Sequence, residues 1–165
     1  MKEFSLNVVY TELDLVSELE EAERKLLEAA TESCDKAYAP YSSFKVGAAV
    51  LLENGKIVYG NNQENAAYPS GLCAERVAMF SASAQYPGIP IIAIAITAKS
   101  GVFHVNFPVS PCGACRQVMA EYENHGNKPI KVILKGESGK IIIVKNISTL
   151  LPLAFNASHL KPDQK

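Results

Sequence analysis

Only four residues, 136–139, separate the last two apolar runs of this chain, which lie at residues 131–135 and 140–145. Both runs have the length of short strands. Parallel strands need a crossover of a dozen or more residues, whereas a short turn can join an antiparallel pair. We therefore predict that the sheet of this protein ends in two antiparallel strands.

Helical and strand-like patterns alternate through the rest of the chain. Apolar residues between Leu15 and Ala37 recur at helical spacing, and Ser17 with Glu20 forms a capping box at the start of this helix. The expected order is a helix at 15–37, a hairpin of strands at 44–52 and 56–60, a helix at 73–85, a strand at 91–97, a helix at 112–122, the antiparallel pair, and a short final helix near 150–155. This order predicts an α/β fold, a three-layer α-β-α sandwich around a mixed five-stranded sheet with the last two strands antiparallel.

The charge of the chain argues against a large polyanionic partner. Its 16 Lys and Arg and 17 Asp and Glu residues give a formal net charge of −1. Since nucleic-acid affinity depends on neutralised phosphates, we expect a small, nearly neutral ligand and no nucleic-acid partner. The N-terminal residues lack the apolar core of a secretory signal, and the longest apolar runs, such as residues 89–98, are too short to cross a bilayer. We expect a cytoplasmic protein that does not bind membranes.

Three of the four cysteines stand at the starts of two expected helices. They occur in the segments Cys73-Ala74-Glu75 and Pro111-Cys112-Gly113-Ala114-Cys115. Cysteine binds zinc as the thiolate, and the partial positive charge of a helix N-terminus favours that form. If both helices begin at the same end of the sheet, the three thiolates converge. Three protein ligands leave the fourth tetrahedral position for water, as in catalytic zinc sites.

Glu75 stands two residues after the first of these cysteines. Zinc lowers the pKa of a bound water to roughly 7, and a nearby carboxylate can carry that proton to a substrate. Such general acid–base catalysis is worth roughly 10²–10⁴ in rate. Three thiolates give the zinc cluster a net negative charge, and we hypothesise that Arg76 offsets it by donating a hydrogen bond to a thiolate.

The spacing of the cysteines leaves other interpretations open. Cys112-x-x-Cys115 alone is also typical of a redox pair or of half a structural zinc site. A structural site needs a fourth ligand, and Cys34 is the remaining cysteine. Cys34 falls on the apolar stripe of the first helix, which favours a packed side chain over a ligand.

The chain resembles the small, homotetrameric, zinc-dependent class of cytidine deaminases in five ordered blocks. They are Tyr38-Ala39-Pro40-Tyr41-Ser42-x-Phe44-Lys45-Val46-Gly47-Ala48-Ala49, Asn62-x-Glu64-Asn65-Ala66, Cys73-Ala74-Glu75-Arg76, Val109-Ser110-Pro111-Cys112-Gly113-Ala114-Cys115-Arg116-Gln117-Val118 and Leu150-Leu151-Pro152-x-Ala154-Phe155. We take residues 15–155, which the resemblance covers, as the catalytic domain. Residues 1–14 are then an N-terminal extension, and residues 156–165 are a polar C-terminal tail.

The resemblance implies an activity and a metal. The enzyme would hydrolyse free cytidine and deoxycytidine to uridine and deoxyuridine with release of ammonia, in pyrimidine salvage. It would hold one Zn²⁺ per subunit through Cys73, Cys112 and Cys115. Hydroxide would attack C4 of the base while Glu75 protonates N3 and then the departing amine.

The resemblance also implies the substrate contacts. Asn62 and Glu64 would bind the ribose hydroxyls, and Phe44 would pack against the pyrimidine, for which a core position on its strand is the competing interpretation. The Ala74 N–H would bind O2 of the base, and the Ser110 carbonyl would accept from the 4-amino group. Phe155 and the stretch from Ala66 to Tyr68 would come from neighbouring subunits, so the resemblance implies a homotetramer with shared sites.

Two residues depart from the family pattern, and three rival functions remain. Leu153 replaces a glycine that is usual before Phe155, and Gln63 replaces a common apolar residue. Deaminases of bases within RNA or DNA usually have His where this chain has Cys73. A deaminase of another aminopyrimidine, such as a blasticidin-type antibiotic, would share the zinc motifs. A zinc-stabilised scaffold without activity would have no use for Glu75.

Overall fold

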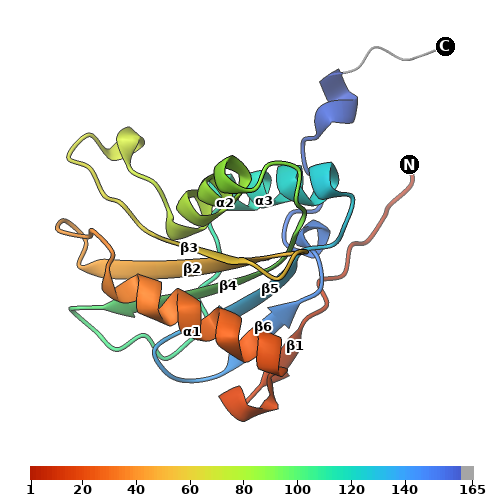
Figure 1. The fold of residues 1–165 in the computed structure, drawn as a ribbon. Helices are drawn as coiled ribbons and strands as arrows, with labels where there is room; N and C mark the ends of the chain where they lie inside the picture. The colour runs from red at the N-terminus through yellow and green to blue at the C-terminus, as the bar shows by residue number, and fades with distance from the viewer. Residues whose placement is uncertain (161–165) are drawn as a thin grey trace.

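The computed structural model describes residues 1–160, in which one mixed sheet lies between two layers of helices (Figure 1). The strands are β1 (Thr11–Leu13), β2 (Phe44–Leu52), β3 (Ile57–Asn61), β4 (Ile91–Ser100), β5 (Lys131–Lys135) and β6 (Ile141–Val144), and the helices are α1 (Glu21–Asp35), α2 (Ala74–Gln85) and α3 (Gly113–Gly126). The strands lie in the order β1-β6-β5-β4-β2-β3. Helix α1 covers one face of the sheet, and α2 and α3 cover the other. The predicted α/β sandwich is confirmed.

The sheet has six strands where the sequence predicted five. The additional strand β1 lies within the N-terminal extension and pairs antiparallel with β6, Leu13 opposite Ile141. Its three residues are too few to show the alternating pattern by which strands are recognised. The antiparallel pairing of β5 with β6 is confirmed, and β4 pairs parallel with β5.

Three of the predicted helices differ from the structure, and one of them, α3, continues to Gly126, past its predicted end at residue 122. Helix α1 begins at Glu21, because the Glu23 carboxylate accepts a hydrogen bond from the Glu20 N–H at 3.0 Å, whereas Ser17 lies in a separate 3-10 turn, Val16–Glu18. No helix forms at residues 150–155. The short 3-10 turns Ile147–Thr149 and Ala157–Leu160 lie on either side of this segment, and a further one, Tyr68–Ser70, precedes α2. Leu153 adopts φ 59°, outside the right-handed helical region, and Pro152 lacks an N–H to donate.

The central strands are buried on both faces and separate two apolar cores. Ile94 and Ile96 of β4 pack toward α2 and α3, whereas Ala93 and Ala95, which alternate with them along the strand, pack toward α1. Successive side chains of a strand point to opposite faces, so one apolar run serves both cores.

Helix α2 lies against β3 with almost no space between the two backbones. A Cβ atom at Gly60 would lie 2.4 Å from the backbone nitrogen of Ala78 and 2.8 Å from the carbonyl oxygen of Ala74. Only glycine permits this approach. The contact fixes the depth at which the start of α2, with Cys73 and Glu75, rests on the sheet.

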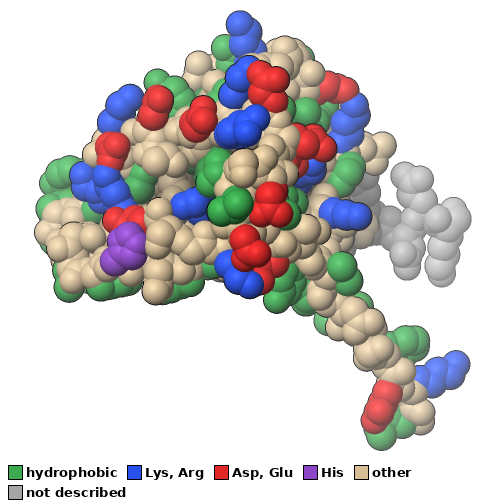
Figure 2. All heavy atoms as spheres, turned by 90° about the horizontal axis from the view of Figure 1, so that it is seen from below, with side chains coloured by type: hydrophobic (Ala, Val, Ile, Leu, Met, Phe, Trp, Pro, Cys, Tyr) green, Lys and Arg blue, Asp and Glu red, His purple; other side chains and the backbone are tan. Residues whose placement is uncertain are grey.

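Residues 1–10 have no regular secondary structure and extend away from the body of the molecule (Figures 1 and 2).

On the face drawn in Figure 2, basic and acidic side chains are interspersed, so a polyanion would meet both signs of charge there. Within residues 1–160, no helix has both the length and the apolar character that crossing a membrane requires. Of the C-terminal tail predicted at 156–165, residues 161–165 lie outside the described residues.

Candidate active site and metal centre

The starts of α2 and α3 meet because of the directions of the strands. Strand β2 pairs antiparallel with both β3 and β4, so β3 and β4 run in the same direction, and β5 is parallel to β4. Helix α2 connects β3 to β4, and α3 connects β4 to β5. Each helix therefore runs back against these strands, and both begin at the same end of the sheet.

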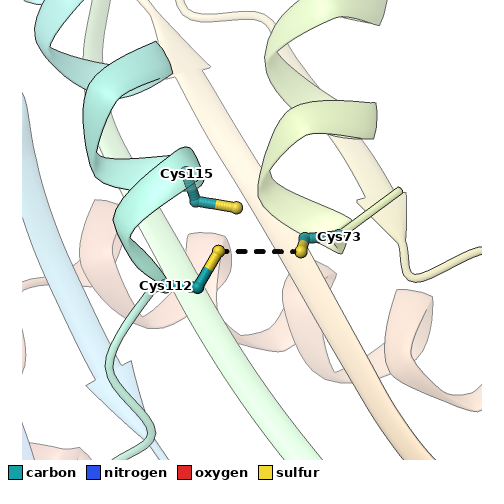
Figure 3. A group of neighbouring side chains, drawn as sticks. All are labelled: Cys73, Cys112 and Cys115. Carbon is teal, nitrogen blue, oxygen red and sulfur yellow. Dashed lines mark hydrogen bonds between the residues drawn. The ribbon is translucent and has the colours of Figure 1, made fainter. Parts of the chain in front are cut away.

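Three sulfur atoms converge at this end (Figure 3). Cys73 is the residue before α2, Cys112 is the residue before α3, and Cys115 lies in the first turn of α3. All three Sγ atoms lie within 4.8 Å of one another, and those of Cys73 and Cys112 are 3.9 Å apart. Tetrahedral zinc with Zn–S bonds of about 2.3 Å places its sulfur ligands about 3.8 Å apart. The cluster therefore fits zinc in both donor type and spacing.

Charge within the cluster favours thiolate. Hydrogen bonding from the Cys115 thiol and from the Arg76 guanidinium lowers the pKa of Cys73 to about 5. Arg76 Nη2 lies 3.6 Å from the Cys73 sulfur, the contact hypothesised from the sequence. Sharing a proton with Cys73, together with burial, raises the pKa of Cys115. The sulfurs thus already share one negative charge, which a bound cation would compensate.

Glu75 lies beside the sulfur cluster in the first turn of α2. Its side chain is buried, with 5% of its surface exposed. Burial raises the pKa of this carboxyl group, and the neighbouring Cys73 thiolate raises it further. A carboxyl group in such surroundings holds a proton more readily than an exposed glutamate, which suits a residue that exchanges protons with a substrate.

A cavity of about 550 Å³ opens in front of the cluster. The residues predicted for the site that line it are Asn62, Glu64, Tyr68, Cys73, Glu75, Arg76, Ser110 and Cys112. Elements separated widely in the sequence thus place two of the three cysteines, the Glu75 carboxyl group and polar side chains around one space, whereas the buried Cys115 is not part of its lining. The volume falls within the range of small-molecule sites.

Asn62 and Glu64 both hold backbone groups at the rim of the cavity. Asn62 Oδ1 accepts from the Val46 N–H at 2.7 Å, and its Nδ2 donates to the Phe44 carbonyl at 2.9 Å. Glu64 accepts hydrogen bonds from the N–H groups of Tyr41 and Ser42 and from the Ser42 hydroxyl. These hydrogen bonds, first of all that of the Ser42 hydroxyl, lower the pKa of Glu64. Both side chains are therefore held in fixed orientations.

The aromatic residues lie in less enclosed positions. Phe44 is outside the lining of the cavity and packs against Phe103, with ring centroids 6.3 Å apart. Tyr68 lines the cavity of its own chain, contacts Tyr41 edge to face and is 77% exposed. Ala66 precedes it in the same exposed loop. Phe155 is 56% exposed and stacks on His159. A single chain leaves the rings of Tyr68 and Phe155 largely uncovered, whereas Phe44 is half-buried.

Two backbone groups predicted to bind the base lie at the helix starts. Ala74 is buried at the first position of α2, where an N–H has no partner within the helix. Ser110 is exposed on the cavity wall, two residues before Cys112. Residue types alone give no signal for such groups, since every residue carries an N–H and a carbonyl.

Sequence reasoning gave no role to two residues that the structure brings to the site. Ser42 binds Glu64 through its hydroxyl, and Arg116 of α3 donates to the Pro111 carbonyl at 2.8 Å. Both belong to the blocks quoted above. The signal for Arg116 was its place directly after Cys115, where a long cation can reach back over the start of its own helix.

These features together define a class of enzyme. Three thiolates, a glutamate two residues after the first of them, and a second block of the form Pro-Cys-x-x-Cys are the hallmarks of zinc-dependent deaminases of nucleobases. The residues identified here meet this description at the end of an α-β-α sandwich.

Comparison with known proteins gives the family. The profile of the cytidine and deoxycytidylate deaminase zinc-binding region matches residues 20–126. The chain belongs to this family of hydrolases, as its motifs indicated. A cytidine deaminase from Sporosarcina psychrophila is 43% identical over 138 residues, which are 82% of this chain and 93% of that protein. One from Halalkalibacterium halodurans is 41% identical over 135 residues, 82% and 95% of the two chains.

Solved structures of the family share the fold. The crystal structure of a cytidine deaminase from Burkholderia pseudomallei, 44% identical, matches with a TM-score of 0.69 over 79% of this chain and 97% of that chain. Since the match covers nearly all of that protein, the unmatched residues of this chain have few counterparts in it.

Proposed function

We propose that this chain hydrolyses free cytidine and deoxycytidine to uridine and deoxyuridine with release of ammonia. The observation that carries the proposal is the convergence of three sulfurs at a cavity of about 550 Å³, whose lining includes Cys73, Cys112 and the buried Glu75. The similarity to proteins named cytidine deaminase supports a nucleoside as substrate. We also propose that the enzyme is cytoplasmic and acts in pyrimidine salvage. Its proposed substrates are free nucleosides, and basic and acidic side chains are interspersed on the face drawn in Figure 2.

Cys73, Cys112 and Cys115 would hold one zinc ion per subunit. Zinc in such a site supplies water activated as a nucleophile near neutral pH. Glu75 would accept one proton of the water and deliver it to N3 of the base as the water oxygen bonds to C4. It would then carry the second proton from that oxygen to the amine, so that the C4–N bond breaks and ammonia leaves. Its burial keeps bulk water away, so the proton passes between the carboxyl group and the substrate. Arg76 donates to the Cys73 sulfur and reduces the negative charge of the cluster.

The ribose would bind between Asn62 and Glu64. A carboxylate offers about four acceptor positions, and Glu64 uses three of them for the backbone and hydroxyl of residues 41 and 42. One acceptor is left for a ribose hydroxyl. The Asn62 amide keeps one N–H and one lone pair in the same way. Preformed groups of this kind bind without a further cost in side-chain entropy.

The base would lie near the starts of the two helices. The Ala74 N–H donates to O2 of the pyrimidine, and the Ser110 carbonyl accepts from the 4-amino group. Phe44 supplies a wall for the ring. It shares a face of β2 with Val46, two residues away, which lines the cavity.

Neighbouring subunits would complete the site in a homotetramer. Tyr68 and Phe155 are 77% and 56% exposed in the single chain. Burying an aromatic side chain of this kind removes about 150–250 Å² from water. In the tetramer, Phe155 and the stretch from Ala66 to Tyr68 would each reach an adjacent site and close its cavity over the substrate. This role would account for the exposure of Tyr68 and Phe155 in the single chain.

A panel of substrates tests the proposed activity. Purified protein is incubated with cytidine, deoxycytidine, cytosine, adenosine and single-stranded oligonucleotides, and released ammonia is measured. We expect turnover of the two cytidine nucleosides only. Turnover of oligonucleotides would instead favour a nucleic-acid deaminase. A zinc-loaded protein without any turnover would favour a scaffold.

Mixing two inactive variants tests the shared sites. In Glu75→Gln subunits the acid–base group is lost, and in Phe155→Ala subunits the ring is lost. If Phe155 serves a neighbouring site, dissociation and reassembly of the mixture creates sites with both residues intact, and activity returns. Activity that stays at the sum of the separate variants would place Phe155 at the site of its own chain.

A further inference from the structure

Helix α3, which begins directly after Cys112 and carries Cys115, also holds the chain that follows β6. Glu123 Oε2 accepts a hydrogen bond from the Ile147 N–H at 2.9 Å. One turn from the start of the helix, Arg116 Nη1 donates to the Leu150 carbonyl at 2.9 Å. The segment from 147 to 150 therefore runs back along α3, from the last turns of the helix toward the end where the sulfurs lie.

A third hydrogen bond holds the same segment farther along. Gln117 Nε2 donates to the Phe155 carbonyl at 2.8 Å. Between this bond and that of Arg116 lies a turn in which Leu153 adopts φ 59°. The backbone that carries Phe155 is thus fixed to α3 on both sides of the turn.

Arg116 differs from the other two side chains because it makes a second contact at the active site. Its Nε donates to the Pro111 carbonyl at 2.8 Å. Pro111 is buried and stands between Ser110, on the cavity wall, and Cys112. One planar guanidinium thus joins the peptide that enters α3 to the peptide that leaves β6. Pro111 and Leu150, whose carbonyl groups bind this guanidinium, are 39 positions apart in the sequence.

We infer that Arg116 is a positioning residue that couples the active site of its own chain to the segment that would complete a neighbouring one. It fixes the Ser110–Cys112 peptide, whose carbonyl would accept from the 4-amino group, relative to the segment that presents Phe155. This inference rests on the proposed function. Beyond that function, we infer that the Arg116 side chain sets the positions of both Ser110 and Phe155. Displacing this side chain would therefore shift both residues at once.

The guanidinium is suited to this task. Its N–H donors point in fixed directions within a plane, so two carbonyls bound to one group are held at a fixed separation. A lysine ammonium can reach one carbonyl or the other, but it does not set the angle between them. Arg116→Lys therefore keeps the charge and loses the rigid link, and Arg116→Met keeps much of the packing and loses both hydrogen bonds.

Hydrogen exchange measures the link without any substrate. In zinc-loaded protein, we expect exchange of the Leu150 and Leu151 amides, which both donate to the Ile147 carbonyl, to rise about tenfold or more in Arg116→Met and to rise less in Arg116→Lys. Arg24→Met, which removes a cation on α1 at the opposite face of the sheet, serves as the matched control and leaves these amides unchanged. Unchanged exchange of both amides in both Arg116 variants would overturn the inference. If Arg116→Met does not fold, Arg116→Lys decides the result.

Steady-state kinetics with cytidine then distinguish positioning from a general loss of stability. We expect kcat/KM to fall on the order of 10²-fold in Arg116→Met. Because Ser110 would contact the reacting amine and Phe155 would enclose the substrate, both a lower kcat and a higher KM are expected, with zinc content unchanged. Wild-type kinetics in a variant with raised exchange would overturn the positioning role. If the unmodified protein turns over neither cytidine nor deoxycytidine, the proposed function fails, and hydrogen exchange still decides whether Arg116 holds the segment.

Discussion

The sulfur atoms of Cys73 and Cys112 lie 3.9 Å apart although 39 positions separate the two residues. Two successive crossovers, from β3 to β4 and from β4 to β5, produce this contact because each returns its helix to the same end of the sheet. The cluster of three sulfurs is therefore a consequence of topology. Whatever shifts either helix along the sheet will separate the sulfur atoms.

Gly60→Ala is expected to shift α2 and to destabilise the protein by at least about 3 kcal/mol. The added Cβ would meet the backbone nitrogen of Ala78 at 2.4 Å, and backbone cannot move aside as a side chain can. Urea unfolding of zinc-loaded protein measures the change. Gly113→Ala is the matched control, since nothing lies within 4 Å of a Cβ at that position. Equal stability of the two variants would show that α2 does not rest on β3 as described.

The order of elements could be predicted because each long element has a strong local pattern. The predicted hairpin of β2 and β3 turns at Asn54-Gly55, a dipeptide typical of tight turns, and the short connection at residues 136–139 determined the pairing of β5 with β6. Strand β1 could not be predicted, since its pairing with β6 depends on contacts 128 and more positions away in the sequence. The start of α1 was misplaced because Ser17-x-x-Glu20 and Glu20-x-x-Glu23 are competing capping signals, and only the second caps the helix.

Glu75→Gln is expected to keep its zinc and its fold and to lose about 10²–10⁴ in kcat. The amide cannot accept and return a proton, whereas its size matches that of the buried carboxyl group. Ammonia release and zinc content are measured together. Glu28→Gln, an exposed glutamate of α1, should behave like the unmodified protein. Retained turnover in Glu75→Gln would mean that another group moves the proton.

Ser42→Ala is expected to raise the pKa of Glu64. The Ser42 hydroxyl is the main cause of the lowered pKa, because a hydrogen bond to the carboxylate favours the charged form. Removing the hydroxyl moves the pKa of Glu64 back toward 4.5, its ordinary value. A ¹³C NMR titration of the carboxyl carbon reports the shift directly. An unchanged titration would mean that the hydroxyl does not bind Glu64 in solution.

The same hydrogen bonds, which join Glu64 to residues 41 and 42, make the stability of the folded protein sensitive to acid. A carboxyl group with a lowered pKa in the folded state contributes stability that is fully present above the unfolded value, about 4.5. That contribution is lost as the pH falls through the lower folded pKa. In Ser42→Ala the loss is expected to be smaller, and comparing the pH dependence of unfolding in the two proteins checks the sign.

Leu153→Gly is expected to leave stability the same or slightly higher, whereas Leu153→Val should lower it by about 1–2 kcal/mol. Leu153 has φ 59°, a conformation that glycine adopts freely and a β-branched residue resists. Its side chain is 94% exposed and adds no packing within the chain. Urea unfolding ranks the three proteins. A marked loss of stability in Leu153→Gly that depends on protein concentration would show that the leucine packs in a subunit interface.

The candidate site was predictable where it depends on residue type and spacing. Cys73, Glu75 and Cys112 could be identified because thiolates and a nearby carboxyl group at two helix starts have few other uses. The engagement of Asn62 with the backbone of β2, and the packing of Phe44 against Phe103, could not be predicted. Both depend on which groups meet after the sheet has formed.

X-ray absorption at the zinc edge of the purified protein tests the central claim most directly. The account predicts three sulfur neighbours at about 2.3 Å and one lighter atom at about 2.0 Å for each zinc. Cys34→Ser should give the same spectrum, because the Cys34 thiol is buried and donates to the Lys45 carbonyl at 3.3 Å on the other side of the sheet. Cys112→Ser should lose a sulfur neighbour or the metal. Four sulfur neighbours in the unmodified protein, or fewer than three, would contradict a catalytic site formed by Cys73, Cys112 and Cys115.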